Sequence, residues 1–136
     1  MKCIIPFQRI ETDHICCMLV INGQQGFFLI DTGASNSCIA KSRQRFYGLI
    51  ADEDPIEAAS AGSERLEAQK MQKVLWEDTQ GNVLGWFPIM LLNLESINDT
   101  LAKQGAPAIE GILGADVLSQ LEAQINYATM RLSLQL

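Results

Sequence analysis

The chain alternates short apolar runs with polar turns, a pattern typical of β-strands. The run over residues 15–21 is unbroken, which predicts a strand buried on both faces. Asn22-Gly23 follows and predicts a tight turn, because both residue types tolerate a positive φ. Aromatic and branched residues then predict a return strand over 26–30. Further strands are expected over residues 3–8, 83–92, 124–127 and 130–136.

Helical patterns are short and few in this sequence. The candidates are residues 41–47, 96–103 and 115–122. Residues 64–75 are ambiguous, because they hold many good helix formers but also fit one long strand that runs to Trp76. Pro88 predicts an edge position or a bulge in the strand that holds it. The pattern as a whole predicts a mainly β fold with one or two short helices.

Composition limits the class of protein and of partner. The 136 residues are expected to form one domain over 1–136, and 48% hydrophobic with 19% charged residues is typical of a globular chain. Lys and Arg number 10 against 16 Asp and Glu, so the net charge is −6. An acidic surface repels phosphate backbones, and we expect no nucleic-acid partner.

Neither a membrane segment nor a metal site is indicated. The longest apolar runs, such as 15–21, are far too short to span a bilayer, and no signal-peptide pattern opens the chain, so a cytoplasmic location without membrane contact is expected. His14 is the only histidine and no C-x-x-C occurs, which predicts no metal and no cofactor. Cys16 and Cys17 should point to opposite faces of their strand. In that compartment Cys3, Cys16, Cys17 and Cys38 are expected to stay reduced.

The chemistry is concentrated where the apolar run 27–30 ends in Asp-Thr-Gly-Ala-Ser, residues 31–35. A carboxylate at the end of a buried strand needs hydrogen-bond donors or a chemical use. The simpler interpretation is a turn at a strand end, where Asp and Gly are common. By composition, an Asp-Thr-Gly triplet arises by chance in roughly 3% of chains of this length. The triplet is therefore a moderate signal by itself.

A second motif strengthens this signal. Ile112-Leu113-Gly114 places two apolar residues and a glycine before a predicted helix. In this order the two motifs resemble the retropepsin-like aspartic proteases, the single-domain relatives of pepsin, and especially their bacterial and cellular members. The resemblance covers nearly the whole chain and implies a closed or partly open β-barrel-like acid protease fold. It also favours strand over helix for residues 64–75, because that fold has no helix there.

Two other families share an Asp-containing strand end, and both are excluded. Actin-like ATPases need a two-domain chain several times longer than this one. Haloacid-dehalogenase-like enzymes need a second Asp two residues after the first, where this chain has Gly33.

The resemblance implies a role for each motif residue. Asp31 would supply the catalytic carboxylate, and the Thr32 hydroxyl would reach the backbone of a second copy. Gly33 would donate its amide to the carboxylate. Ile112, Leu113 and Gly114 would pack under the catalytic loop and hold it. Substrate main chain would be bound by Gly33, Ala34 and Ser35 and by the flap-tip residues Ala61 and Gly62.

One Asp-Thr-Gly per chain predicts a homodimer that acts on a peptide or protein substrate. Pepsin-type hydrolysis needs two carboxylates that share one proton. The other candidate, Asp116, stands at a helix start and is better explained as a cap or dipole partner. The second carboxylate is therefore expected from another copy of Asp31 on a two-fold axis. The terminal strands, over 3–7 and 130–136, are expected to contribute to the contact, since their apolar alternation needs a partner.

Some features depart from the family pattern. Viral members often carry an acid and an arginine that form an ion pair where this chain has Ser35 and Ala115, which fits a non-viral member. The flap, over residues 58–66, lacks a second glycine or an aromatic residue. The leading hypothesis is an aspartic endopeptidase. The alternatives are a catalytically silent dimerisation or peptide-binding module of the same fold, and a structural β domain with a chance turn motif.

Overall fold

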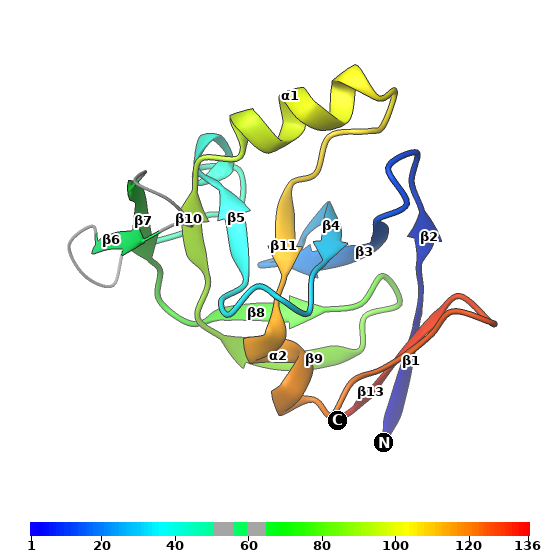
Figure 1. The fold of residues 1–136 in the computed structure, drawn as a ribbon. Coiled ribbons are helices and arrows are strands. Elements are labelled where there is room, and N and C mark those ends of the chain that lie inside the picture. The colour runs from blue at the N-terminus through cyan, green and yellow to red at the C-terminus, as the bar shows by residue number, and fades with distance from the viewer. Residues whose placement is uncertain (51–55, 60–64) are drawn as a thin grey trace.

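The computed structural model describes residues 1–50, 56–59 and 65–136 (Figure 1). It confirms the predicted fold class, because strands dominate and the α-helices are short. The strands are β1 Lys2–Pro6, β2 Gln8–Arg9, β3 Ile15–Ile21, β4 Gln24–Ile30, β5 Cys38–Ala40, β6 Ile56–Ala59, β7 Arg65–Lys70, β8 Val74–Glu77, β9 Val83–Phe87, β10 Met90–Leu92, β11 Gly111–Leu113, β12 Gln124–Asn126 and β13 Arg131–Gln135. The helices are the 3-10 helix η1 Lys41–Arg43, α1 Glu95–Lys103 and α2 Ala115–Gln120.

The larger sheet curls into a half-barrel with the strand order β6-β7-β10-β5-β11-β4-β3-β8-β9, and β2 pairs with β3 (Figure 1). Most neighbouring strands are antiparallel, but β11 runs parallel to β4 and β10 runs parallel to β5. Because β11 lies between β4 and β5, the residues that join β4 to β5 must pass over its end. These joining residues, 31–37, are called the Asp31 loop below.

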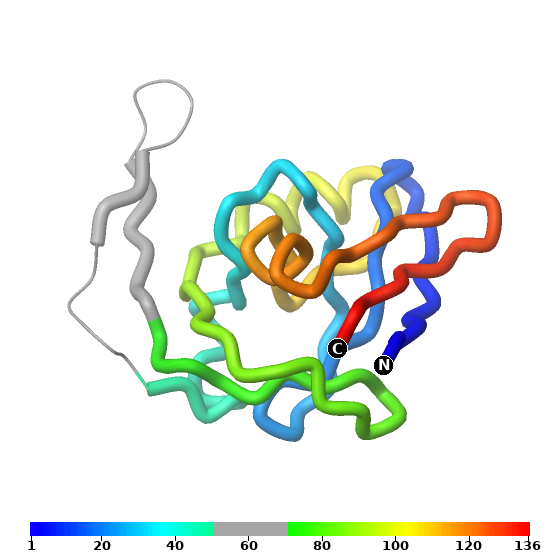
Figure 2. The backbone as a smooth tube through the Cα atoms, turned by 90° about the horizontal axis from the view of Figure 1, so that it is seen from below, coloured from blue at the N-terminus to red at the C-terminus, as the bar shows by residue number. Residues whose placement is uncertain are grey.

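The smaller sheet has the order β1-β13-β12, and it brings the two chain ends together (Figure 2). The amide of Leu136 donates to the carbonyl of Met1 over 2.7 Å. Leu132 and Leu134 on β13 are 0% and 2% exposed within the chain's own core. The buried apolar residues of the terminal strands thus pack within their own chain. The argument that their apolar alternation needs a second copy as its partner is therefore wrong.

Apolar side chains pack on both faces of the sheet around β3. On one face the Trp76 ring lies 6.0 Å from Phe28 and 6.1 Å from Phe87, centroid to centroid. Cys17 belongs to this cluster, whereas Cys16 belongs to a second cluster that includes Leu94 and Leu101 next to and within α1. The two cysteines therefore face opposite sides, as predicted. Burial on both faces explains the unbroken apolar run of β3.

The predicted helix over 41–47 is reduced to η1, followed by turns up to Gly48. The side-chain amide of Asn22 donates to the Tyr47 carbonyl over 3.0 Å, and Gly48 has a φ of +60°, so a longer helix does not continue there. Within the ambiguous stretch 64–75, β7 and the start of β8 confirm strand over helix, but as two strands and not as one long strand. Pro88 separates β9 from β10 in the stretch predicted as one strand.

Candidate functional site

Asp31 lies directly after β4, at the start of the Asp31 loop, and its side chain is half-buried. Its amide donates to the carbonyl of Leu113 over 2.9 Å, which continues the pairing of β4 with β11. One carboxylate oxygen, Oδ1, accepts the Gly33 amide at 2.9 Å. The hydrogen bond expected from Gly33 is thus present, and backbone bonds fix the carboxylate at the strand end.

The loop folds closely over the junction of β11 and α2. The amide of Ala115 donates to the Ala34 carbonyl over 2.7 Å. A Cβ atom built on Gly114 would lie 2.7 Å from that same carbonyl oxygen, so only glycine fits at this position. Gly111 is enclosed as well, because a Cβ there would collide with the Cys38 carbonyl and the Phe28 ring. These glycines allow a close approach of two backbones.

The apolar pair of the second motif lies under the loop, where the sequence predicts it. Leu113 pairs in register with Ile30 and is 2% exposed. Ile112 stands between Leu29 on one side and Cys38 on the other. Both side chains are buried, but in different clusters, so β11 links the two cores directly beneath Asp31.

Asp116 has a contact that sequence reasoning missed. It lies in the first turn of α2, and its Oδ1 accepts the Val117 amide at 2.9 Å. The helix N-cap is Gly114, so Asp116 is not the cap. Its carboxylate accepts two hydrogen bonds from Ser37, from the hydroxyl at 2.7 Å and from the amide at 3.1 Å. The one available sequence signal was a serine next to an apolar run.

A groove of about 280 Å³ opens beside Thr32. Thr32, Gly33 and Ser35 are exposed, whereas Ala34 is half-buried. The groove is lined by Thr32, Ala115, Leu118, Ser119, Glu122, Ala123 and Ile125. This set joins the Asp31 loop to α2 and β12, and most of its side chains are small or apolar.

The predicted flap-tip residues, Ala61 and Gly62, lie outside the described residues. The strands on either side, β6 and β7, are antiparallel, with Ala58 opposite Leu66.

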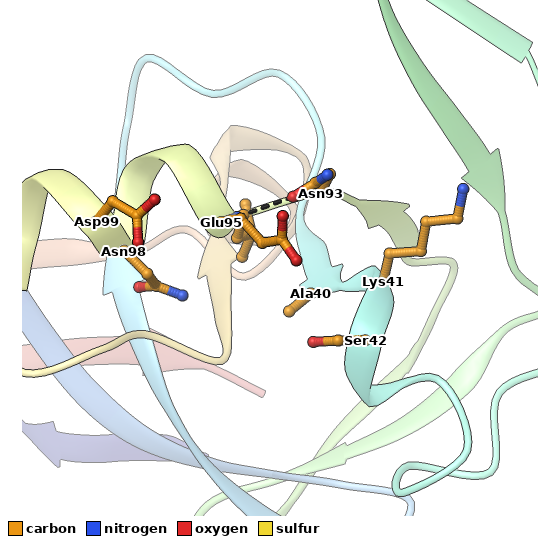
Figure 3. Close-up of a pocket in the computed structure, with 8 residues that line it drawn as sticks. Ala40, Lys41, Ser42, Asn93, Glu95, Asn98 and Asp99 are labelled. Carbon is orange, nitrogen blue, oxygen red and sulfur yellow. Dashed lines mark hydrogen bonds between the residues drawn. The ribbon is translucent and has the colours of Figure 1, made fainter.

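A second cavity, of about 540 Å³, lies between η1 and α1 (Figure 3). Its asparagine side chains are hydrogen-bonded to the backbone. Asn93 accepts the Glu95 amide at 2.9 Å, and Asn98 both donates to and accepts from the backbone of Ile109. The Lys41 side chain extends away from the carboxylates of Glu95 and Asp99. None of the residues predicted for the site lines this cavity.

Cys38 is the titratable group next to the loop whose pKa is most clearly changed. Burial raises its pKa to about 12. A backbone hydrogen bond from Ile112 lowers the pKa, and the charges of Asp116 and Asp31 raise it. The thiol is therefore protonated and unreactive at neutral pH.

All four cysteines are free and buried. Within the part of the chain that the structure describes, no three His, Cys, Asp or Glu side chains gather as metal ligands would. Over the same residues, no helix is both long and apolar enough to cross a membrane.

Comparison with known proteins gives a family match in sequence and similar folds among solved structures. The sequence profile of the family described as "Retroviral aspartyl protease" matches residues 12–126. Among solved structures, the retroviral protease-like domain of Ddi1 from Leishmania major is similar, with 17% identity, a TM-score of 0.61, and coverage of 88% of this chain and 86% of that one. A retropepsin-like aspartic protease from Rickettsia conorii has 16% identity and a TM-score of 0.58, and the match covers 98% and 90% of the two chains. No curated protein matches in sequence.

Proposed function

The chain belongs to the retroviral aspartyl protease family, and from this premise we propose that it is an aspartic endopeptidase that cleaves peptide or protein substrates as a homodimer. The observation that carries the proposal is the placement of Asp31. Its carboxylate lies at the end of a buried strand, is held by the Gly33 amide, and belongs to the single Asp-Thr-Gly of the chain. The fold itself is shared with the two similar structures.

The second carboxylate of the site comes from the partner copy in this proposal. Water activation by aspartates needs two carboxyl groups close enough to share one proton. Asp116 is another acid near the loop, but its carboxylate faces Ser37 and Val117 and accepts hydrogen bonds from both. Two-fold symmetry then brings two copies of Asp31 together on the axis.

The reaction follows from one proton shared by two carboxylates. The ionised carboxylate takes a proton from water, whose oxygen attacks the scissile carbonyl carbon, while the protonated carboxyl gives its proton to the carbonyl oxygen. The resulting diol collapses as the C–N bond breaks. The amine nitrogen takes a proton from one carboxyl, and a diol hydroxyl returns one to the other. The pair ends with one proton again, and no covalent enzyme intermediate forms.

The surface beside Thr32 supports the dimer. Thr32 is exposed in the single chain and lines the groove beside α2 and β12. A partner copy on this groove would bury its apolar lining and bring the two Asp31 loops together. The exposed residues Gly33 and Ser35, with Ala34 between them, would then line a cleft for substrate main chain.

Asp31→Asn tests this function. It should abolish cleavage of a peptide library while the dimer persists in sedimentation, as tight or tighter, because the negative charge of the proton-sharing pair is removed from the axis. Asp99→Asn is the matched control, since Asp99 lines the other cavity, and it should leave cleavage unchanged. Cleavage that survives in Asp31→Asn would refute the proposal. A dimer of the unaltered chain that binds peptides without cutting any would favour the silent binding module instead.

A further inference from the structure

The far end of the Asp31 loop is fixed by side chains. Ser37 is 0% exposed, and its hydroxyl donates to Asp116 over 2.7 Å and accepts the Gly114 amide at 2.8 Å. The Ser37 amide also donates to the Asp116 carboxylate over 3.1 Å. We call these bonds among Ser37, Gly114 and Asp116 the Ser37–Asp116 tie.

The tie leads to the catalytic carboxylate through the backbone. Gly114 directly follows Leu113, and the Leu113 carbonyl accepts the amide of Asp31 at 2.9 Å. The Ser37 hydroxyl therefore fixes the end of β11 that anchors Asp31. Without that hydroxyl the buried Gly114 amide loses its acceptor and stays unpaired unless the backbone shifts.

The acceptor oxygens of Asp116 explain why this side chain suits the position. They accept hydrogen bonds from two backbone amides and one hydroxyl. One of these amides, that of Ser37, lies at the end of the Asp31 loop. The other, that of Val117, lies in the first turn of α2. One side chain thus joins the loop to the helix behind it.

We propose that Ser37 and Asp116 are positioning residues for Asp31: their tie holds the end of β11, and through it the catalytic carboxylate, in the geometry that activates water. This inference rests on the proposed function, because it assigns a catalytic effect to residues that touch no reacting atom.

Four variants test the tie, with Asp78→Ala as the matched control. Asp78 is a buried carboxylate that, like the half-buried Asp116, accepts backbone amides, but it lies in the turn between β8 and β9, outside the Asp31 loop. Asp116→Ala and Ser37→Ala should each lower kcat about 100-fold at saturating dimer with KM nearly unchanged, as a misplacement near 1 Å would. The double variant should lose no more than either single one, because the pair acts as a unit. Asp116→Asn keeps the oxygen that accepts from Ser37 and Val117 and should recover most of kcat.

Amide hydrogen exchange provides a readout that needs no cleavage. In Asp116→Ala and Ser37→Ala the amides of Asp31 and Gly114 should exchange at least about tenfold faster relative to the core, and in Asp78→Ala they should not. Equal exchange of these amides in Asp116→Ala and Asp78→Ala would overturn the tie, whatever happens to cleavage. A kcat loss in Asp78→Ala as large as that in Asp116→Ala would also overturn it. If the unaltered chain cleaves no peptide, the proposed function fails, and the exchange rates still decide whether the tie holds Asp31.

Discussion

A Cβ atom on Gly114 would stand 2.7 Å from the carbonyl oxygen of Ala34, a separation that real Cβ atoms do not show. The same carbonyl accepts the amide of Ala115, so it cannot turn away without breaking that bond. The backbone of Asn36 closes the other side, at 3.1 Å. The glycine of the second motif is therefore required by the contact between the Asp31 loop and the start of α2.

Gly114→Ala should consequently lose both stability and activity. Overpacking a buried contact costs about 1–3 kcal/mol, and relief of the clash would push the Asp31 loop out of place. We expect a lower midpoint in urea unfolding and a large loss of kcat. Gly81→Ala is the control: Gly81 has open space around it but a φ of +84°, so its substitution should cost about 1–2 kcal/mol and leave kcat unchanged. Full activity in Gly114→Ala would show that the loop position does not depend on this contact.

Thr32→Ala should weaken the dimer. If the hydroxyl bridges to the partner's backbone, its removal leaves a desolvated group unpaired at a cost of about 1–3 kcal/mol, and symmetry counts the loss twice. Activity should fall most at low protein concentration. Thr32→Ser keeps the hydroxyl and should behave almost as the parent does. Sedimentation that finds Thr32→Ala as dimeric as the parent at every concentration would refute the bridge.

The sequence predicts a contact of this site when both residues lie in one motif. It does not predict a contact between residues that are distant in the chain. Asp31 and Gly33 are two residues apart, so the turn that joins them could be predicted from local pattern alone. The pairing of Leu113 with Ile30 could not, because a short parallel pair gives no local signal. The resemblance of the two motifs to a known family predicts only that Ile112, Leu113 and Gly114 pack under the loop, and the register with Ile30 comes from the structure.

The Ser37–Asp116 tie shows the limit of motif reasoning. The tie joins residues 79 positions apart, and each is unremarkable in its own segment. The reason given for a dimer contact of β1 and β13 has a similar limit, because the sequence does not show that Leu132 and Leu134 are already buried by their own chain.

Asp78 provides a test of stability against pH. Burial raises the pKa of this carboxyl, but hydrogen bonds from Asn82, Cys3 and Gln80 outweigh that effect and hold the pKa below its usual value. A carboxyl with a lowered folded-state pKa stabilises the fold above its unfolded-state pKa of about 4, and this contribution is lost as the pH falls through the folded-state value.

Asp78→Asn should therefore be less stable than the parent at pH 7, by about 1–3 kcal/mol, and the difference should shrink on acidification below pH 4. Urea unfolding of both proteins at matched pH steps measures it. A difference that stays constant from pH 7 to pH 2 would show that the ionised carboxylate contributes nothing, and that the loss arises from packing alone.

The groove beside Thr32 gives the sharpest test of where a second copy docks. Ser119 and Gln120 are adjacent and exposed on α2, but only Ser119 lines the groove. Ser119→Arg would fill the groove and place a cation on each side of the axis, whereas Gln120→Arg adds the same side chain outside it.

Because neither position is buried, both variants should fold with nearly the parent's stability. If the partner sits on this groove, Ser119→Arg should raise the dimer dissociation constant at least about tenfold, or 1.4 kcal/mol, and Gln120→Arg should not. Equal dissociation constants for the two variants in sedimentation equilibrium would place the two-fold contact elsewhere on the chain.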